Sequence, residues 1–203
     1  MIDELSVCEH PTKERTEQIL SDKISYAEAT LDRTIGFINN SESKTGITLT
    51  IVGVILTVLF ALSGENIMNM FSQTWDDFGL ITGAFLILFC ASLSASLFGI
   101  YKLIKVLTPM LNVKELEDEK FEKDSKIYFG RISKNNKEYS QYRDKLLNYS
   151  QEDYLNDLWS QIYINSKICA TKFSNFYVGL RFAIPGLLSL LAVVMIFSFF
   201  ILG

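Results

Sequence analysis

The sequence predicts an all-α integral membrane protein with three transmembrane helices and a cytoplasmic helical region. The 203 residues are 49% hydrophobic and 21% charged, which is too apolar for an ordinary soluble domain and too charged for a simple membrane plug. Three stretches, residues 45–64, 78–101 and 182–203, contain no Asp, Glu, Lys or Arg. A helix rises about 1.5 Å per residue and the hydrocarbon core is about 30 Å thick, so about 20 residues cross it. Each stretch is long enough.

These stretches are expected to form helices, because lipid offers no hydrogen-bond partners and a helix pairs its backbone groups internally. The alternative, three buried helices of a large soluble core, is disfavoured in a chain of this size. The connector 65–77 has no Lys or Arg, and all 19 cations lie before the first span or between the second and third. The positive-inside rule therefore predicts that the N-terminus and residues 102–181 are cytoplasmic, and that the C-terminus is external.

The N-terminal region, residues 1–44, is predicted to hold an amphipathic helix. Between residues 14 and 39, apolar side chains recur every three or four positions: Leu20, Ile24, Ala27, Leu31, Ile35 and Ile38. We expect Ser41 or Ser43 to cap a new helix that enters the first span, 45–64. Residues 65–77 are then a short external loop.

The second span carries a stripe of small residues, which let helices approach closely in lipid. Its members are Gly79, Gly83, Ala91, Ala95 and Gly99. The stripe packs either against other spans of the same chain, or between protomers or along a water path. No charge lies inside a span, which disfavours a coupled transporter. In the third span, Pro185 is expected to kink the helix.

A heptad pattern precedes the third span and has one polar member, Ser166. Its members are Leu155, Trp159, Ile162, Ser166, Cys169, Phe173, Phe176 and Leu180. The pattern predicts one nearly continuous helix over 151–203, from the cytoplasm into the membrane. Such a helix is a lever that transmits tilt, a static coiled-coil stalk, or a helix whose apolar stripe packs on the N-terminal helix.

No catalytic motif occurs in the chain, and the sequence predicts neither an enzyme nor a cofactor. The single histidine, His10, cannot serve a metal cluster, and the three cysteines lack metal-site spacing. The net charge of −4 disfavours bulk nucleic-acid binding.

A small anionic ligand fits the stretch KIYFGRISKNNKEY, residues 126–139, better. Cations hold phosphate and aromatic faces hold a base. The phosphate candidates are Arg131, Lys134 and Lys137, and the stacking candidates are Tyr128, Phe129 and Tyr139. The same residue types also anchor proteins at lipid headgroups, so both interpretations stay open. Farther along the chain, a polar helix face either meets the ligand or binds the N-terminal helix, and its members are Asp157, Gln161, Asn165 and Lys172.

Three stretches carry a family resemblance in a fixed order relative to the spans. They are FINNSESKTGITLTIVGVIL (37–56), with an acid, Glu42, two residues before a Lys; IYFGRISKNNKEYSQYRDKL (127–146), with a Phe-Gly block and a Glu-Tyr; and DLWSQIYINSKICATKFSNF (157–176). On these stretches the chain resembles the transmembrane effectors of Pycsar, the bacterial pyrimidine-cyclase antiphage systems. Glu42 stands where the family more often has Asp.

The resemblance implies a partner cyclase that makes cyclic CMP or cyclic UMP upon infection. The effector would sense that nucleotide and impair the inner membrane, so that the infected cell dies in abortive infection. Three thin spans cannot enclose a water path alone, so a homo-oligomer is expected. The alternatives are a ligand-independent channel or holin-like toxin, and a membrane-anchored scaffold.

Overall fold

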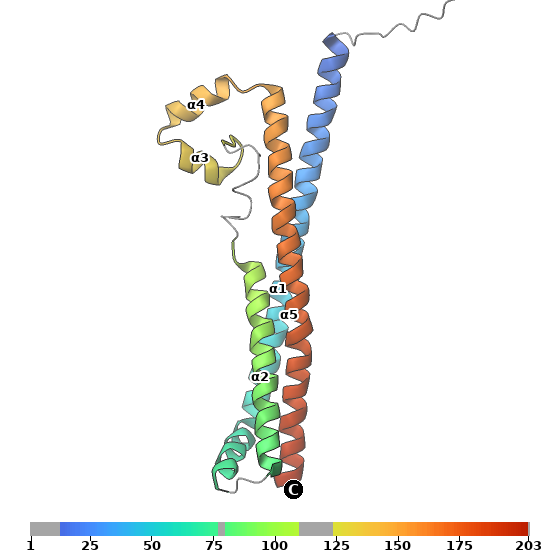
Figure 1. Cartoon of the computed structure of the whole chain (residues 1–203), viewed down its shortest axis with the longest axis vertical. Coiled ribbons are helices and arrows are strands. Elements are labelled where there is room, and N and C mark those ends of the chain that lie inside the picture. Colours follow the sequence, from blue (N-terminus) through green and yellow to red (C-terminus); the bar gives the residue numbers. More distant parts are fainter. Residues whose placement is uncertain (1–12, 77–79, 110–123, 203) are drawn as a thin grey trace, which may run out of the picture. The chain divides into compact units, whose positions relative to one another are not determined.

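The computed structural model describes residues 13–76, 80–109 and 124–202, and the regular structure throughout them is helical (Figure 1). The helices are α1 (Lys13–Asp76), α2 (Leu80–Leu107), α3 (Phe129–Asn135), α4 (Tyr139–Leu147) and α5 (Gln151–Leu202). Three of them, α1, α2 and α5, each contain a stretch long and apolar enough to cross a membrane. The predicted all-α fold class with three spans is confirmed.

The chain divides into two compact units. The first comprises Met1–Gly36 and Leu111–Ile168, and the second comprises Phe37–Met110 and Cys169–Gly203. Helices α1 and α5 each contribute residues to both units. The first unit also contains α3 and α4, and the second contains α2.

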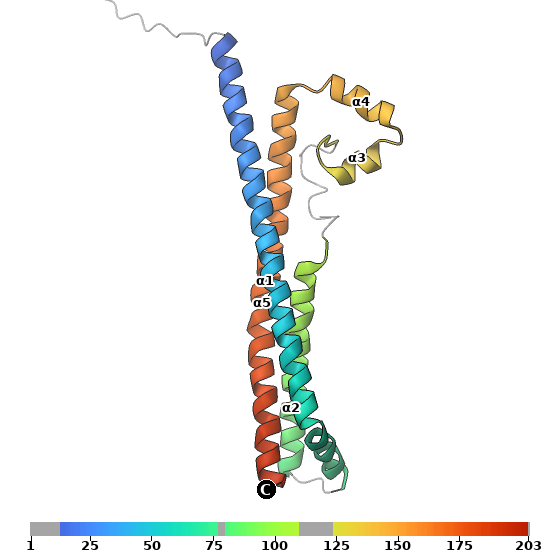
Figure 2. The same cartoon turned by 180° about the vertical axis from the view of Figure 1, so that it is seen from behind.

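In the first unit, α5 lies between α1 and the α3–α4 pair, as both views show (Figures 1 and 2). The core forms around Ala27, Leu155 and Leu158, against which Leu20, Ile24, Leu31, Ile127, Tyr154 and Ile162 pack. Four residues of the predicted N-terminal stripe belong to this core. The heptad pattern is only partly used, because Trp159 is half exposed while Leu158, outside the pattern, is buried. Helix α5 is therefore rotated from the face that the pattern favours.

Helix α5 begins with a capping box. Ser150 Oγ accepts a hydrogen bond from the Asp153 amide (3.1 Å), and Asp153 Oδ2 accepts one from the Ser150 amide (3.2 Å). This reciprocal arrangement satisfies amides that have no partner inside the helix. From there α5 continues to Leu202, as the heptad pattern predicts. It runs through Pro185, whose ring removes one backbone hydrogen bond without ending the helix.

The second unit is a bundle of three apolar helices. Its core joins residues of α1, α2 and α5: Leu59, Ile67, Phe89, Leu190, Val193, Val194 and Phe197. Many large apolar side chains outside this core are exposed, among them Ile51, Val54, Ile87, Leu188 and Met195. An apolar exterior around an apolar core suits a bundle surrounded by lipid.

Helix α1 is continuous through the expected helix start at 41–43. Ser41 Oγ donates to the carbonyl of Ile38 (2.8 Å) and Thr45 Oγ1 to that of Ser41 (2.7 Å), so these hydroxyls bond within the helix and cap nothing. The helix also extends to Asp76, through residues expected to form a loop. No proline interrupts the chain there, and a lone glycine, Gly64, does not end a helix by itself.

Candidate functional site

The six predicted nucleotide-binding residues lie on α3, at the start of α4 and beside them. Tyr128 immediately precedes α3, Phe129 begins it, and Tyr139 begins α4. Phe129 and Tyr139 are 66% and 76% exposed, so both residues are accessible to a ligand. The centroids of the Tyr128 and Phe129 rings are 5.0 Å apart.

The Tyr128 ring folds over Gly130. A Cβ atom there would lie 2.9 Å from the Tyr128 ring, so a larger residue at position 130 would displace the ring. Arg131 and Lys134 are one turn apart on α3 and share a face, and Lys137 lies in the connection to α4. The structure therefore gathers three cations and three aromatic rings within one short helical hairpin.

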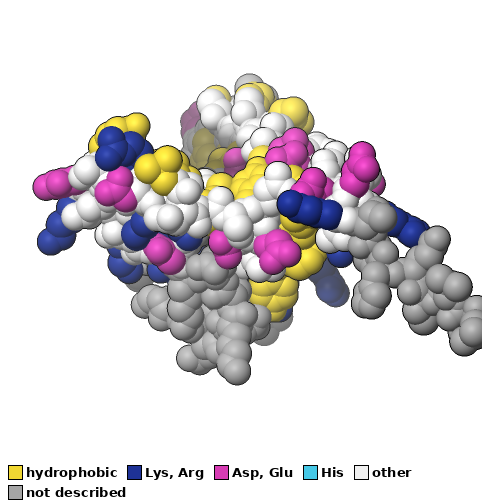
Figure 3. Space-filling model, turned by 90° about the horizontal axis from the view of Figure 1, so that it is seen from above, with side chains coloured by type: hydrophobic (Ala, Val, Ile, Leu, Met, Phe, Trp, Pro, Cys, Tyr) yellow, Lys and Arg dark blue, Asp and Glu magenta, His cyan; other side chains and the backbone are white. Residues whose placement is uncertain are grey.

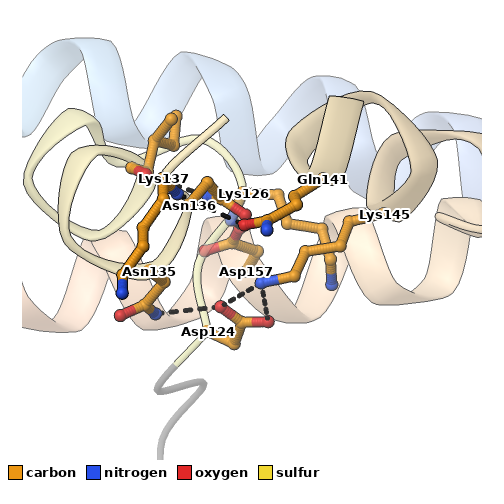
Figure 4. Close-up of polar contacts among 9 residues, drawn as sticks. Asp124, Lys126, Asn135, Asn136, Lys137, Gln141, Lys145 and Asp157 are labelled. Atoms are coloured by element: carbon orange, nitrogen blue, oxygen red, sulfur yellow. Dashed lines mark hydrogen bonds and ion pairs between the residues drawn. The ribbon is translucent and has the colours of Figure 1, made fainter. Parts of the chain in front are cut away.

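The α3–α4 segment (residues 124–149) closes on itself through Asp124. The Asp124 carboxylate accepts a hydrogen bond from Asn135 (2.9 Å) and pairs with Lys145 Nζ (3.3 Å), as Figure 4 shows. The hydrogen bond from Asn135, aided by Lys145, holds the pKa of Asp124 below its ordinary value. Asp124 thus links the end of α3 to α4.

Asp157 of α5 holds both ends of this segment. Its side chain is 0% exposed, and Oδ2 accepts a hydrogen bond from the Lys126 amide (2.8 Å); Asp157 and Lys126 are labelled in Figure 4. Oδ2 also accepts one from the Tyr149 hydroxyl (2.9 Å). We call this arrangement of Asp157, Lys126 and Tyr149 the clasp. The Lys126 ammonium also lies 4.5 Å from the centroid of the Tyr149 ring. The two ends are therefore bound to one carboxylate and to each other.

Gln161 and Tyr142 reinforce the clasp. Gln161, one turn after Asp157, donates to Ser125 Oγ (3.3 Å), which also accepts from the Tyr128 amide (3.0 Å). The Tyr142 hydroxyl donates to the carbonyl of Lys126 (3.0 Å). A movement of α3 relative to α4 would therefore act directly on α5.

Two buried acceptor oxygens have no hydrogen-bond partner among the described residues: Asp157 Oδ1 and Asn136 Oδ1. Leaving such oxygens unpaired costs about 1–3 kcal/mol each. Both belong to the clasp or to the segment that it holds. A ligand with N–H donors is one group that could satisfy them.

Within the first unit, Tyr154 connects α5 to α1. Its hydroxyl donates to Glu28 Oε1 (2.8 Å), and this bond raises the pKa of Tyr154 to about 12. A shallow groove on the same unit is lined by Ile19, Asp22, Lys23, Tyr26 and Trp159. The groove contains none of the six predicted nucleotide-binding residues.

The remaining residues of the predicted polar face have other surroundings. Asn165 is half-buried and donates to the carbonyl of Gln161 within α5. Lys172, in the second unit, is 2% exposed and forms an ion pair with Glu42 Oε1 of α1 (2.8 Å). Its ammonium also donates to the carbonyls of Val106 and Thr108 at the end of α2.

The small-residue stripe of α2 is used at one end. Gly99 lies against Ala183 of α5, whereas Ala91 is exposed and Gly79 lies outside the described residues. The close approach continues at Gly186, which packs against Ser96 of α2. The observed packing face of α2 is therefore turned from the predicted stripe, although it shares Gly99.

Sequence reasoning missed Ser125, Tyr142, Tyr149 and the pairing of Glu42 with Lys172. The capping box S-x-x-D at 150–153 was a local signal for the start of α5. No local signal marks the clasp, because its members come from distant parts of the chain.

Seen from above, the molecule presents Lys and Arg interspersed with Asp and Glu (Figure 3). Among the described residues, this face has no broad field of one sign. An anionic ligand would therefore depend on individual cations for its binding.

Comparison with known proteins gives a consistent result. The model of the PycTM family, described as the Pycsar effector protein domain, matches residues 26–199. The chain is 28% identical over 172 residues to the Pycsar effector protein GmPycTM of Gulbenkiania mobilis, covering 78% of this chain and 84% of that protein. No solved structure matches the chain.

Proposed function

The chain belongs to the Pycsar effector family, whose members are membrane effectors of antiphage defence, and on that premise we propose that a cyclic pyrimidine mononucleotide gates it. A partner cyclase would supply cyclic CMP or cyclic UMP. Binding would rearrange the membrane helices of a homo-oligomer and impair the inner membrane, which kills the infected cell.

The clasp is the observation that carries this proposal. The α3–α4 segment offers cations for a phosphate and exposed rings for a base, and both of its ends are bonded to Asp157 of α5. Helix α5 continues without interruption to Leu202. A ligand that draws α3 and α4 together would therefore pull on a helix that also contributes to the membrane unit.

The ligand must favour the active state over the resting state, because equal affinity for both shifts nothing. A change from 1:99 to 99:1 needs about 5.5 kcal/mol of differential affinity. Several nucleotides bound to a symmetric oligomer would share that requirement.

We further propose that the N-terminus and the α3–α4 segment are cytoplasmic and the C-terminus external. The distribution of cations supports this orientation. At the end of α2, Lys102 lies over the Phe98 ring and Lys105 over the Tyr101 ring, at 5.7 Å and 4.9 Å from the centroids. Cations and aromatics together are typical of the cytoplasmic interface.

The binding test compares cyclic CMP, cyclic UMP and a cyclic oligonucleotide on the full chain in detergent. Replacing Arg131 and Lys134 by Ala should raise the Kd for the cyclic mononucleotide at least about tenfold, since charge-assisted hydrogen bonds to phosphate are lost at a partly exposed site. The matched control replaces Lys13 and Arg15, exposed cations of α1, and should leave the Kd unchanged.

An unchanged Kd in the Arg131 and Lys134 variant would remove the site from the α3–α4 segment. If Trp159→Ala instead weakened binding, the ligand would belong in the groove lined by Tyr26 and Trp159. Binding of the cyclic oligonucleotide alone would contradict the proposed ligand class.

A further inference from the structure

Lys172 is a buried cation in a position where an apolar residue would carry no desolvation penalty. Its side chain is 3% exposed, and removing an ammonium from water carries a large penalty unless partners surround it. An ammonium has three donors, and three acceptor oxygens surround this one: Glu42 Oε1 and the carbonyls of Val106 and Thr108. The penalty is offset only in this arrangement.

The partners of Lys172 come from each of the other two helices of the second unit. Glu42 belongs to α1, while the Val106 carbonyl lies in the last turn of α2 and the Thr108 carbonyl immediately follows that helix. Carbonyls at a helix end lack partners inside the helix and carry partial negative charge. A single nitrogen atom on α5 therefore holds α1 and α2 at once.

The contacts described between α2 and α5 at Gly99, Gly186 and Ser189 involve no charged group. Gly99 and Gly186 bring α2 and α5 together by close van der Waals packing, and Ser189 bonds Ser92 (2.9 Å). Lipid is as apolar as the bundle core, so no hydrophobic force opposes separation of these faces. Separation at Lys172 is different, because it would strip a buried charge of its acceptors.

Glu42 keeps its ion pair with Lys172 accessible to water. Its side chain is 38% exposed, and it precedes the apolar run of α1, so water reaches the pair from the polar side of the bundle. A buried cation with a half-exposed counter-ion can be released without carrying both charges through the apolar interior.

We infer that Lys172, Glu42 and the carbonyls of Val106 and Thr108 form a latch that keeps the three membrane helices in the resting arrangement. Movement of α5 that withdraws Lys172 from α1 and α2 releases the bundle. The inference deepens the proposed function, because it names the contact that must break when the effector is activated.

The test measures membrane depolarisation in bacteria that express the full chain and contain no pyrimidine cyclase. Lys172→Met keeps an unbranched side chain of similar length but removes the donors. Glu42→Gln keeps the shape of the acid but removes its charge. Each variant should depolarise the membrane at least about tenfold faster than the wild type, as expected when a resting state of about 99% loses a tenfold preference.

Two controls accompany these variants. Glu42→Asp keeps the counter-ion, and Lys167→Met removes an exposed lysine of the same helix. Both should behave as the wild type. The amount of each protein in the membrane fraction is measured in parallel.

The latch is overturned if Lys172→Met and Glu42→Gln reach wild-type amounts in the membrane and remain silent. It is equally overturned if neither variant accumulates, because the pair then serves folding and not gating. If only Glu42→Gln fails to accumulate in the membrane, the depolarisation caused by Lys172→Met decides whether the latch exists. Lys172→Met is the fairer test in that case, because it leaves no unpaired buried cation.

This test is separable from the proposed function. A wild-type protein that responds to the cyclase while the latch variants stay silent would refute the latch alone. Latch variants that depolarise the membrane beside a wild type that ignores the cyclase would refute nucleotide gating alone.

Discussion

Replacing Asp157 by Ala removes the carboxylate that holds both ends of the α3–α4 segment. Two hydrogen bonds to a charged acceptor are lost, from the Lys126 amide and the Tyr149 hydroxyl, each worth about 1.5–3 kcal/mol. Relief of the unpaired oxygen Oδ1 offsets about 1–3 kcal/mol of that loss. At the midpoints of these ranges, the clasp should weaken by about 2.5 kcal/mol, or roughly 70-fold in its opening equilibrium.

Hydrogen exchange measures this opening directly, because the Lys126 amide is bonded to Asp157. Exchange at Lys126 should accelerate by about that factor in Asp157→Ala. Asp32→Ala, an exposed acid of α1, is the matched control and should leave exchange at Lys126 unchanged.

The same variant should lose its response to the cyclase. If the clasp transmits the signal, Asp157→Ala no longer depolarises the membrane when nucleotide is made, although it still reaches the membrane. The reasoning would be refuted if the Lys126 amide of Asp157→Ala exchanged at the wild-type rate. It would also be refuted if this variant depolarised the membrane fully when nucleotide is made.

Two further predictions concern packing and pH. Gly99→Ala should lower the free energy of unfolding in detergent by about 1–3 kcal/mol, because the added Cβ would lie 2.7 Å from Ala183 Cα. The control Gly53→Ala should leave that free energy unchanged, because an added Cβ there has nothing within 4 Å. Equal effects of the two substitutions would contradict the packing described. Tyr154→Phe should remove a contribution to stability that is present below pH 10 and lost as pH rises through about 12, since the bond to Glu28 raises the pKa of Tyr154 in the folded state. Thermal unfolding of both proteins between pH 8 and 11 checks this, and a difference that grows with pH would contradict it.

The membrane helices were predictable because lipid imposes a simple rule on the sequence. A charge-free stretch of sufficient length is expected to form a helix that crosses the bilayer, and this expectation needs no knowledge of its neighbours. The continuity of α5 was likewise visible in the absence of a strong helix breaker before Gly179. The helix start predicted near Ser41 is absent from the structure, where α1 is continuous. Serine and threonine hydroxyls can bond to carbonyls within a helix, as Ser41 and Thr45 do, and do not always cap a helix end.

The clasp and the latch were harder to predict because neither follows a local period. Asp157 and Lys172 were placed on one polar face, and the structure gives them different partners in different units. Their partners include backbone groups, such as the Lys126 amide and the Val106 carbonyl, that carry no sequence signal. Trp159 illustrates the same limit, since the heptad spacing could not show that Leu158 is buried in the core with Ala27 of α1 while Trp159 is half exposed.

Membrane potential in living bacteria tests the central claim most directly. Wild-type chain is expressed with an active pyrimidine cyclase, with a catalytically dead cyclase, and alone, and a potential-sensitive dye is followed in each culture. Nucleotide gating predicts that the potential collapses only with the active cyclase. Equal collapse in all three cultures, or a stable potential throughout, would contradict it.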